Sequence, residues 1–70
     1  MARYEITHNE DTVRTIVSEN QDVVRNMMNL ILKLSDENAG VFTSWRVELD
    51  SETGRRNYTR IASAKNGTKI

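Results

Sequence analysis

The sequence contains no cysteine and no proline, and only one tryptophan, one phenylalanine and one histidine among 70 residues. Without cysteine the chain has neither a disulfide nor a thiolate metal site, and His8 alone cannot form a zinc site. A domain of this size buries only about 60% of the surface of its unfolded chain, so its stability is marginal. We therefore expect reinforcement by another protein chain, and no metal or other cofactor.

Motifs for catalysis or ligand binding are also absent. The sequence has no glycine-rich phosphate loop, no nucleophile elbow, no paired histidines and no acidic calcium loop. His8, Glu10 and Asp11 have the residue types of an acid and base group, but three polar residues at this place are typical of a helix cap. The sequence therefore predicts a protein that is not an enzyme.

Basic and acidic side chains, ten of each, cancel, so the net charge gives no indication of nucleic acid or membrane as a partner. Residues 1–40 have four basic and seven acidic side chains, whereas residues 41–70 have six basic and three acidic ones. The simplest interpretation is an acidic helix next to a basic hairpin in one molecule. No stretch approaches the roughly 18 apolar residues of a membrane-spanning helix. The start lacks a signal-peptide pattern, so we expect a cytoplasmic protein without membrane contact.

The first half of the sequence predicts a strand followed by a long helix. Residues 3–7 alternate polar and apolar side chains, with Tyr4 and Ile6 on one side, as in a half-buried strand. The next residues, THNE, have the spacing of a capping box, with Asn9 as an alternative cap, so the helix would begin near residue 9. With no proline to stop it, the helix would reach about Leu34, roughly 38 Å at 1.5 Å per residue.

The predicted helix has an apolar seam with the alternating spacing of four and three residues that is typical of helix pairs. Its members are Val13, Val17, Asn20, Val24, Met27, Ile31 and Leu34. The seam is widened by Ile16, Val23 and Leu30 on one flank and by Met28 and Leu32 on the other. At 100° per residue the apolar arc beyond residue 23 is about 200° wide. One small sheet cannot cover this arc.

A second copy of the helix, or another protein, would cover the remaining apolar surface, whereas packing on the chain's own sheet is the alternative. A lone amide such as Asn20 can pair with its copy and fix the register of a dimer. Flexible methionines such as Met27 and Met28 suit a partner that fits imperfectly. The expected contact face consists of Val17, Asn20, Val24, Met27, Met28, Ile31 and Leu32.

The second half of the sequence predicts a β-hairpin, in which VFTSWRVEL and RRNYTRIAS flank the loop DSETG. A three-residue loop with Gly54 in the left-handed conformation would pair Ser51 with Arg55. A four-residue loop would instead pair Asp50 with Arg55. The two loops differ by one residue in register, and therefore turn different side chains to each face.

The three-residue loop places Trp45 opposite Ile61 and gathers the apolar side chains on one face, whereas the four-residue loop places Trp45 opposite Arg60. We favour the three-residue loop. The outer face then carries a patch of Phe42, Arg46, Arg56, Tyr58 and Arg60. Such a patch fits phosphates or an acidic protein surface, although surface arginines that balance Glu48 across the strands are the plainer interpretation.

Together these elements predict an α+β fold with a short N-terminal strand, one long amphipathic helix and a C-terminal β-hairpin, in the order β-α-β-β. The helix would lie on one face of a small antiparallel sheet. Residues 1–64 would form a single domain, and residues 65–70 a flexible C-terminal tail.

For function, the leading hypothesis is a small non-enzymatic protein-protein interaction module. It would be a homodimer through its helix and would act as a regulator or inhibitor by binding a larger protein assembly, a type common among phage-encoded proteins. The alternative is a nucleic-acid-binding protein that uses the basic face of the hairpin. A third possibility is a small structural subunit of a larger particle.

Overall fold

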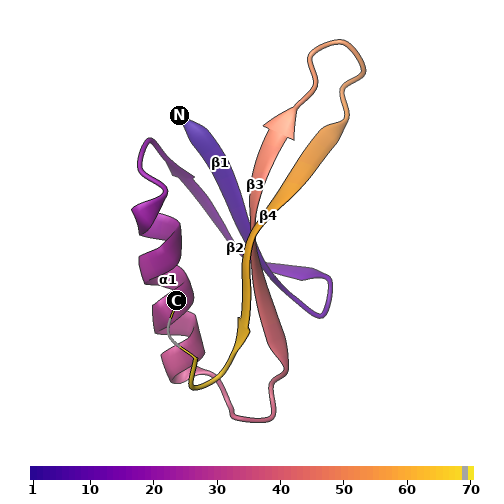
Figure 1. The fold of residues 1–70 in the computed structure, drawn as a ribbon. Coiled ribbons are helices and arrows are strands. Elements are labelled where there is room, and N and C mark those ends of the chain that lie inside the picture. The colour runs from indigo at the N-terminus through magenta and orange to yellow at the C-terminus, as the bar shows by residue number, and fades with distance from the viewer. Residues whose placement is uncertain (69) are drawn as a thin grey trace.

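The computed structural model describes residues 1–68 and residue 70, and within them it shows four strands and one helix (Figure 1). In chain order the elements are β1 (Ala2–His8), β2 (Asp11–Ser18), α1 (Asp22–Leu34), β3 (Val41–Leu49) and β4 (Arg56–Lys65). The strands form one antiparallel sheet in the order β2-β1-β3-β4. The predicted α+β class is confirmed, but the order of elements is β-β-α-β-β, with one strand more than predicted.

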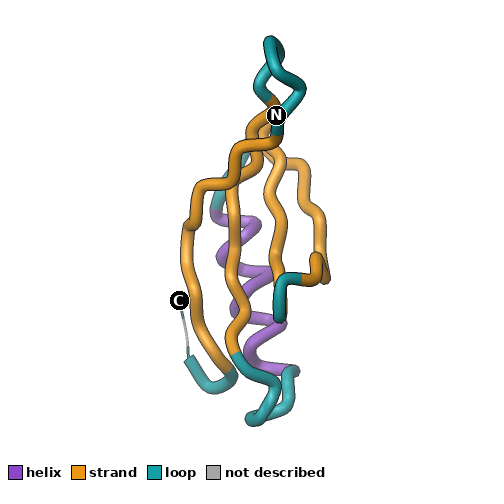
Figure 2. Tube along the Cα trace, turned by 90° about the vertical axis from the view of Figure 1, so that its right-hand side faces the viewer, coloured by secondary structure: helices purple, strands orange, loops and turns teal. Residues whose placement is uncertain are grey.

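The molecule is elongated, with principal extents of 41 × 23 × 14 Å. Figure 2 shows α1 as a second layer behind the sheet, so the helix covers one face of the sheet only. The end of the β3–β4 hairpin extends beyond the helix (Figure 1). In the described part of the chain, the other sheet face is therefore without a covering element.

The predicted helix start near residue 9 is wrong, because β1 and β2 form a hairpin there. Asn9 and Glu10 make its two-residue turn, and both have positive φ, 51° and 70°. Two successive residues with positive φ form a two-residue turn whose twist matches that of the strands in a hairpin. Asparagine is one of the residues that tolerate this conformation. Residues 12–17, TVRTIV, are mostly β-branched, which favours a strand.

A bulge in β2 explains why its strand pattern is hidden in the sequence. Ile6 pairs with Arg14 but Thr7 pairs with Thr12, so Val13 has no partner in β1. The bulge interrupts the two-residue alternation of a strand. It leaves valines at positions 13 and 17, and this spacing of four residues also fits a helix.

The helix α1 begins after β2 and is half the predicted length. The side-chain oxygen of Asn20 accepts a hydrogen bond from the amide of Asp22 at 2.9 Å, and the amide of Asn20 donates to the Ser18 hydroxyl at 3.1 Å. Asn20 thus lies in the loop before the helix, outside any helix seam. At the other end, the amide of Ser35 donates to the Ile31 carbonyl at 2.9 Å.

The core lies between α1 and the central strands, and it is small. Its cluster of buried side chains consists of Ile6, Met28, Leu32, Phe42 and Ala64. His8 borders this cluster, where its ring stacks on Phe42 with centroids 4.4 Å apart and its Nε2 donates to the carbonyl of Ala39. Such a core gives a 70-residue chain little reserve of stability.

Both hairpin registers considered from the sequence occur in β3–β4, one at each end. Near the turn the loop has four residues, because the Asp50 amide donates to the Arg55 carbonyl at 2.8 Å and Trp45 pairs with Arg60. Farther from the turn the register shifts by one residue, and Phe42 pairs with Ala64. The predicted three-residue loop, with Trp45 opposite Ile61, is therefore wrong near the turn. The predicted left-handed conformation of Gly54 is confirmed by its positive φ.

The residues after β4 contact the end of the helix. The Asn66 side-chain amide donates to the carbonyl oxygens of Leu32 and Ser35, at 2.8 and 2.7 Å. These are carbonyls that a helix end leaves without partners in the helix itself. The strand β4 extends to Lys65, one residue into the predicted tail. The flexibility of residues 65–70 stays a prediction, and Lys69 lies outside the described residues.

Candidate functional site

The apolar surface of α1 divides into a buried line and an exposed stripe. Val24, Met28 and Leu32, which follow each other at intervals of four residues, are each 1% exposed or less and face the sheet. These three residues of the predicted contact face are therefore occupied by the chain's own core, and they are not free for a partner.

The exposed part is the α1 stripe, which consists of Val23, Met27, Leu30 and Leu34. Val23 is 40% exposed, Leu30 49% and Leu34 74%, whereas Met27 is half-buried. The intervals of four, three and four residues place all four side chains along one flank of the helix. The expected excess of apolar helix surface is thus present, although only Met27 of the stripe was in the predicted contact face.

A shallow groove of about 390 Å³ runs beside the stripe and reaches the β1–β2 hairpin. Val13, which is 47% exposed, lines it together with Met27, Leu30, Ile31 and Leu34. The bulge in β2 is what directs an apolar side chain to this place, outside the regular alternation of the strand. Val17 of the predicted contact face lies on β2, where it is 59% exposed, and it does not line the groove.

A second surface lies on the face of the sheet that α1 leaves open. Near the hairpin turn Arg60 pairs with Trp45, Tyr58 with Val47 and Arg56 with Leu49. Paired residues in adjacent strands point to the same face. The outer sheet face therefore combines Trp45 with Arg56, Tyr58 and Arg60.

Two members of the predicted arginine patch are elsewhere. Phe42 is 6% exposed and belongs to the core. Arg46 pairs with buried Tyr4 on the helix side of the sheet, and its Nε lies 3.1 Å from a carboxylate oxygen of Glu48. The sequence missed Trp45 as a member because the bulge at the middle of β4 changes which side chains share a face.

The outer sheet face is hollowed between the aromatic side chains and the β1–β2 hairpin. The hollow is about 250 Å³ and is lined by Glu5, Thr7, Glu10, Thr12, Trp45 and Tyr58. Trp45 Nε1 donates a hydrogen bond of 2.9 Å to the Thr7 hydroxyl, which fixes the indole ring. The rings of Trp45 and Tyr58 are tilted by 58°, with centroids 6.3 Å apart.

Glu5 is a buried carboxylate at the wall of this hollow, with 6% of the residue exposed. Its Oε1 accepts a hydrogen bond from the Thr12 hydroxyl at 3.0 Å, and its Oε2 lies 3.9 Å from Arg3 Nε, beyond hydrogen-bond distance. A buried carboxylate is expensive unless its oxygens are hydrogen-bonded. Oε2 forms an ion pair with Arg3, and among the described residues no buried side-chain oxygen is left without a partner. Each carboxylate oxygen accepts more than one hydrogen bond, so Glu5 can still accept one from a donor that enters the hollow.

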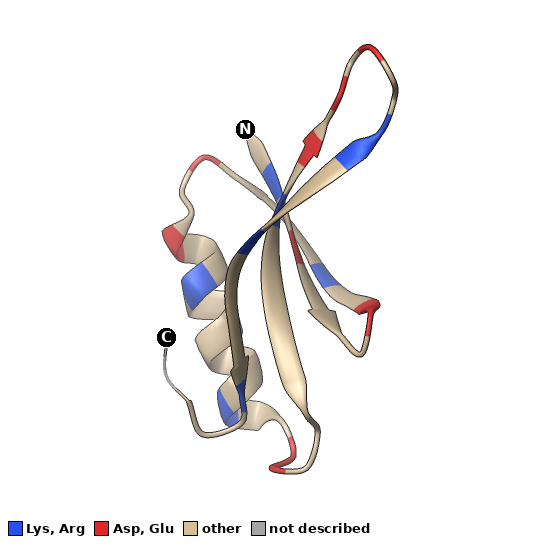
Figure 3. Cartoon of the chain, turned by 45° about the vertical axis from the view of Figure 1, so that its right-hand side comes forward, with Lys and Arg blue, Asp and Glu red and all other residues tan. Residues whose placement is uncertain are grey.

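Figure 3 shows basic residues along β4 and acidic residues mostly in the turns. The described ion pairs are Arg3–Glu5, Arg25–Asp22 and Arg46–Glu48. Arg56 and Arg60 are exposed and have no carboxylate within ion-pair distance among the described residues. The outer end of β4 thus offers two guanidinium groups to a partner.

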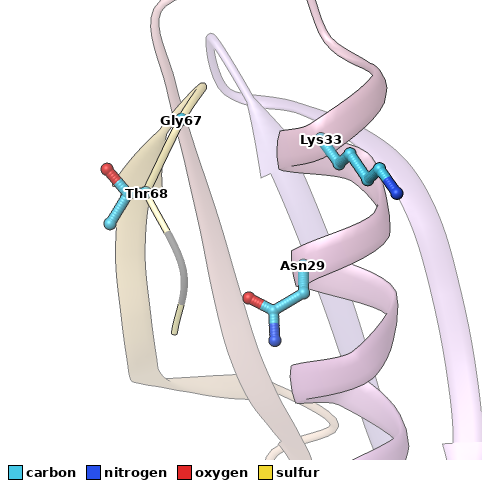
Figure 4. Close-up of a pocket in the computed structure, with 4 residues that line it drawn as sticks. All are labelled: Asn29, Lys33, Gly67 and Thr68. Atoms are coloured by element: carbon cyan, nitrogen blue, oxygen red, sulfur yellow. The ribbon is translucent and has the colours of Figure 1, made fainter.

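A further depression, between α1 and the C-terminal segment, is lined by Asn29, Lys33, Gly67 and Thr68 (Figure 4). The Asn29 amide is already used, because it donates to the Ile70 carbonyl and accepts from the Ile70 amide. Lys33 points away from Thr68 in Figure 4. The side chains of Asn29, Lys33 and Thr68 do not converge on a ligand position.

Within residues 1–68 and 70, no three His, Cys, Asp or Glu side chains are grouped as metal ligands. The same part of the chain has no helix with the length and apolar character needed to cross a bilayer. Comparisons with protein-family profiles, with curated proteins and with solved structures find no match for this chain. The α1 stripe and the outer sheet face are therefore the features from which a function is inferred.

Proposed function

We propose that the protein is a cytoplasmic, non-enzymatic interaction module that forms a homodimer through the α1 stripe and regulates a larger protein assembly. The observation that supports this is the row of apolar side chains at Val23, Met27, Leu30 and Leu34, three of which are 40% or more exposed. Three of them, Met27, Leu30 and Leu34, line one groove together with Val13. Contiguous apolar surface of this kind is typical of protein interaction sites.

The spacing of the stripe favours a helix as its partner. Side chains at alternating intervals of four and three residues interdigitate with the same pattern on a facing helix. A second copy of the chain supplies this pattern, and a two-fold axis perpendicular to the helices would set the two helices antiparallel. The acidic first turn, with Asp22, would then lie near the basic last turn of the other copy, with Lys33. This arrangement is favourable for the side-chain charges and for the helix dipoles.

A dimer also supplies what the small core lacks. Each chain encloses a cluster of five buried residues, and a chain of this length alone is at the margin of stability. Burial of a leucine side chain contributes about 1.5–3 kcal/mol. The two exposed leucines of α1 in each chain, Leu30 and Leu34, therefore make pairing of the helices a large addition to a marginal fold.

Size-exclusion chromatography with light scattering tests this proposal with two matched variants. Leu30→Glu places a charge in the stripe, and Leu49→Glu places the same charge on a residue that is 69% exposed at the far end of β3. We expect the unchanged protein and Leu49→Glu to have the mass of two chains, and Leu30→Glu that of one. If Leu30→Glu keeps the mass of two chains, or if the unchanged protein has the mass of one chain, the stripe is not the dimer contact.

A further inference from the structure

The outer sheet face has a cationic edge that follows from the register of the hairpin. Arg56, Tyr58 and Arg60 alternate along β4, so their side chains point to the same face. The two arginines are about 13 Å apart at 3.3 Å per residue, with the tyrosine ring between them. Neither guanidinium lies within ion-pair distance of a carboxylate in the described part of the chain. Planar guanidinium groups bind phosphate oxygens in pairs.

One of the two aromatic side chains beside this edge is held in place and the other is exposed. Trp45 is fixed by its hydrogen bond to Thr7, and Tyr58 is 45% exposed. Their tilted rings border a hollow of about 250 Å³, which is smaller than the roughly 300–1,000 Å³ pockets that enclose whole drug-sized ligands. The hollow is therefore suited to a single flat ring that belongs to a longer, extended ligand.

The buried carboxylate of Glu5 gives the hollow a chemical preference. Its Oε1 accepts a hydrogen bond from Thr12, and its Oε2 forms an ion pair with Arg3 at 3.9 Å. Because each carboxylate oxygen accepts more than one hydrogen bond, a donor that enters next to Trp45 would find a further acceptor position at Glu5. Cytosine, adenine and guanine have an exocyclic amino group that donates hydrogen bonds, and thymine and uracil have none.

We propose that the outer sheet face binds single-stranded nucleic acid, with Arg56 and Arg60 on phosphates, one base stacked on Tyr58 beside Trp45, and the amino group of that base donating to Glu5. Single strands fit because their bases are free to stack on aromatic side chains, whereas those of a duplex are not. An acidic protein surface would use the two arginines but would leave the aromatic hollow empty. The site is independent of the α1 stripe, which lies on the helix side of the sheet.

The single tryptophan of the chain is in the proposed site, so its fluorescence reports binding directly. The unchanged protein is titrated with short oligodeoxycytidylate, oligodeoxythymidylate and oligocytidylate, and with polyglutamate as an anion without bases. We expect quenching by the cytidylates, with weaker binding of the thymidylate. With two phosphate contacts, the logarithm of the association constant should fall linearly with the logarithm of the salt concentration. The slope should be about −1.4, since each contact contributes about −0.7 for single strands.

Four variants separate stacking, phosphate contacts and base preference. Tyr58→Ala should weaken cytidylate binding by about 5- to 150-fold, the range for loss of one stacked base. Arg60→Gln should weaken it and reduce the salt slope by about 0.7. Glu5→Gln should reduce the preference for cytidylate over thymidylate. Arg46→Gln, on the opposite face of the sheet, is the control and should change nothing.

The outcomes that overturn the proposal are equally specific. They are no quenching by any oligonucleotide at low salt, binding of polyglutamate as tight as that of the cytidylates, or equal loss of binding in Arg46→Gln and Arg60→Gln. Tighter binding of oligocytidylate than of oligodeoxycytidylate supports the proposal and identifies RNA as the ligand. Tighter binding of the oligodeoxycytidylate also supports the proposal and identifies DNA as the ligand.

Discussion

At the scale of single residues, the turns of the two hairpins are where backbone conformation and side-chain chemistry are most closely linked. Asn9 and Glu10 both adopt positive φ, although only asparagine commonly does so. In the other turn Gly54 takes the left-handed conformation, and the Asp50 side chain accepts hydrogen bonds from the amides of Glu52 and Thr53, at 2.9 and 3.4 Å. Each turn therefore gives a prediction for one residue.

Replacement of Glu10 by glycine should stabilise the protein. The φ of 70° at Glu10 brings its Cβ close to backbone atoms, and this conformation costs a non-glycine residue about 1–2 kcal/mol. Glycine adopts it freely, although it has more conformational freedom to lose on folding. We expect Glu10→Gly to raise the free energy of unfolding in urea by about 1 kcal/mol. A decrease would show that the Glu10 side chain makes a contact that outweighs the strain.

The Asp50 carboxylate should titrate below its usual pKa of about 3.8, because the amides of Glu52 and Thr53 donate to its charged form. A pKa that is lower in the folded state means that the group stabilises the turn above pH of about 3.8 and loses this effect as the pH falls through the folded pKa. NMR titration of the Asp50 carboxyl carbon measures the midpoint directly. A midpoint at or above the usual value would show that the turn is not formed as described.

At the scale of elements, the sequence predicted those parts in which periodicity and local chemistry agree. The strand over residues 3–7, the end of the helix at Leu34 and the strand VFTSWRVEL are confirmed. The bulges in β2 and β4 are what could not be predicted, because each shifts the register by one residue. The bulge in β2 gave a strand an apolar spacing that also fits a helix. The bulge in β4 placed Trp45 on the same face as Arg60, and a strict two-residue alternation does not predict this.

The C-terminal end of α1 depends on a side chain from another element. Asn66 donates hydrogen bonds to the carbonyl oxygens of Leu32 and Ser35. We expect Asn66→Ala to lower the free energy of unfolding by about 1–2 kcal/mol, because two partly buried carbonyls lose their donor. Asn57→Ala, at an exposed position on β4, is the control and should have little effect. Equal effects of the two substitutions would show that the Asn66 contacts contribute nothing to stability.

At the scale of the whole molecule, the sheet separates two surfaces of different chemistry. The helix side carries the apolar α1 stripe, and the outer side carries Trp45, Tyr58 and the arginines of β4. Pairing of two helices would leave both outer sheet faces accessible. The width of the apolar arc in the sequence predicted the exposed surface on the helix. The structure assigns that surface to the α1 stripe, because Val24, Met28 and Leu32 face the sheet instead.

The most direct test of the central inference, that the exposed apolar surface of α1 pairs with a second copy of the chain, is the mass of the unchanged protein in solution as a function of concentration. Sedimentation equilibrium should show the mass of two chains at high concentration and dissociation to single chains on dilution. A mass of one chain at every concentration would contradict the inference, because the exposed valine and leucines of α1 would then be stable in water without a partner.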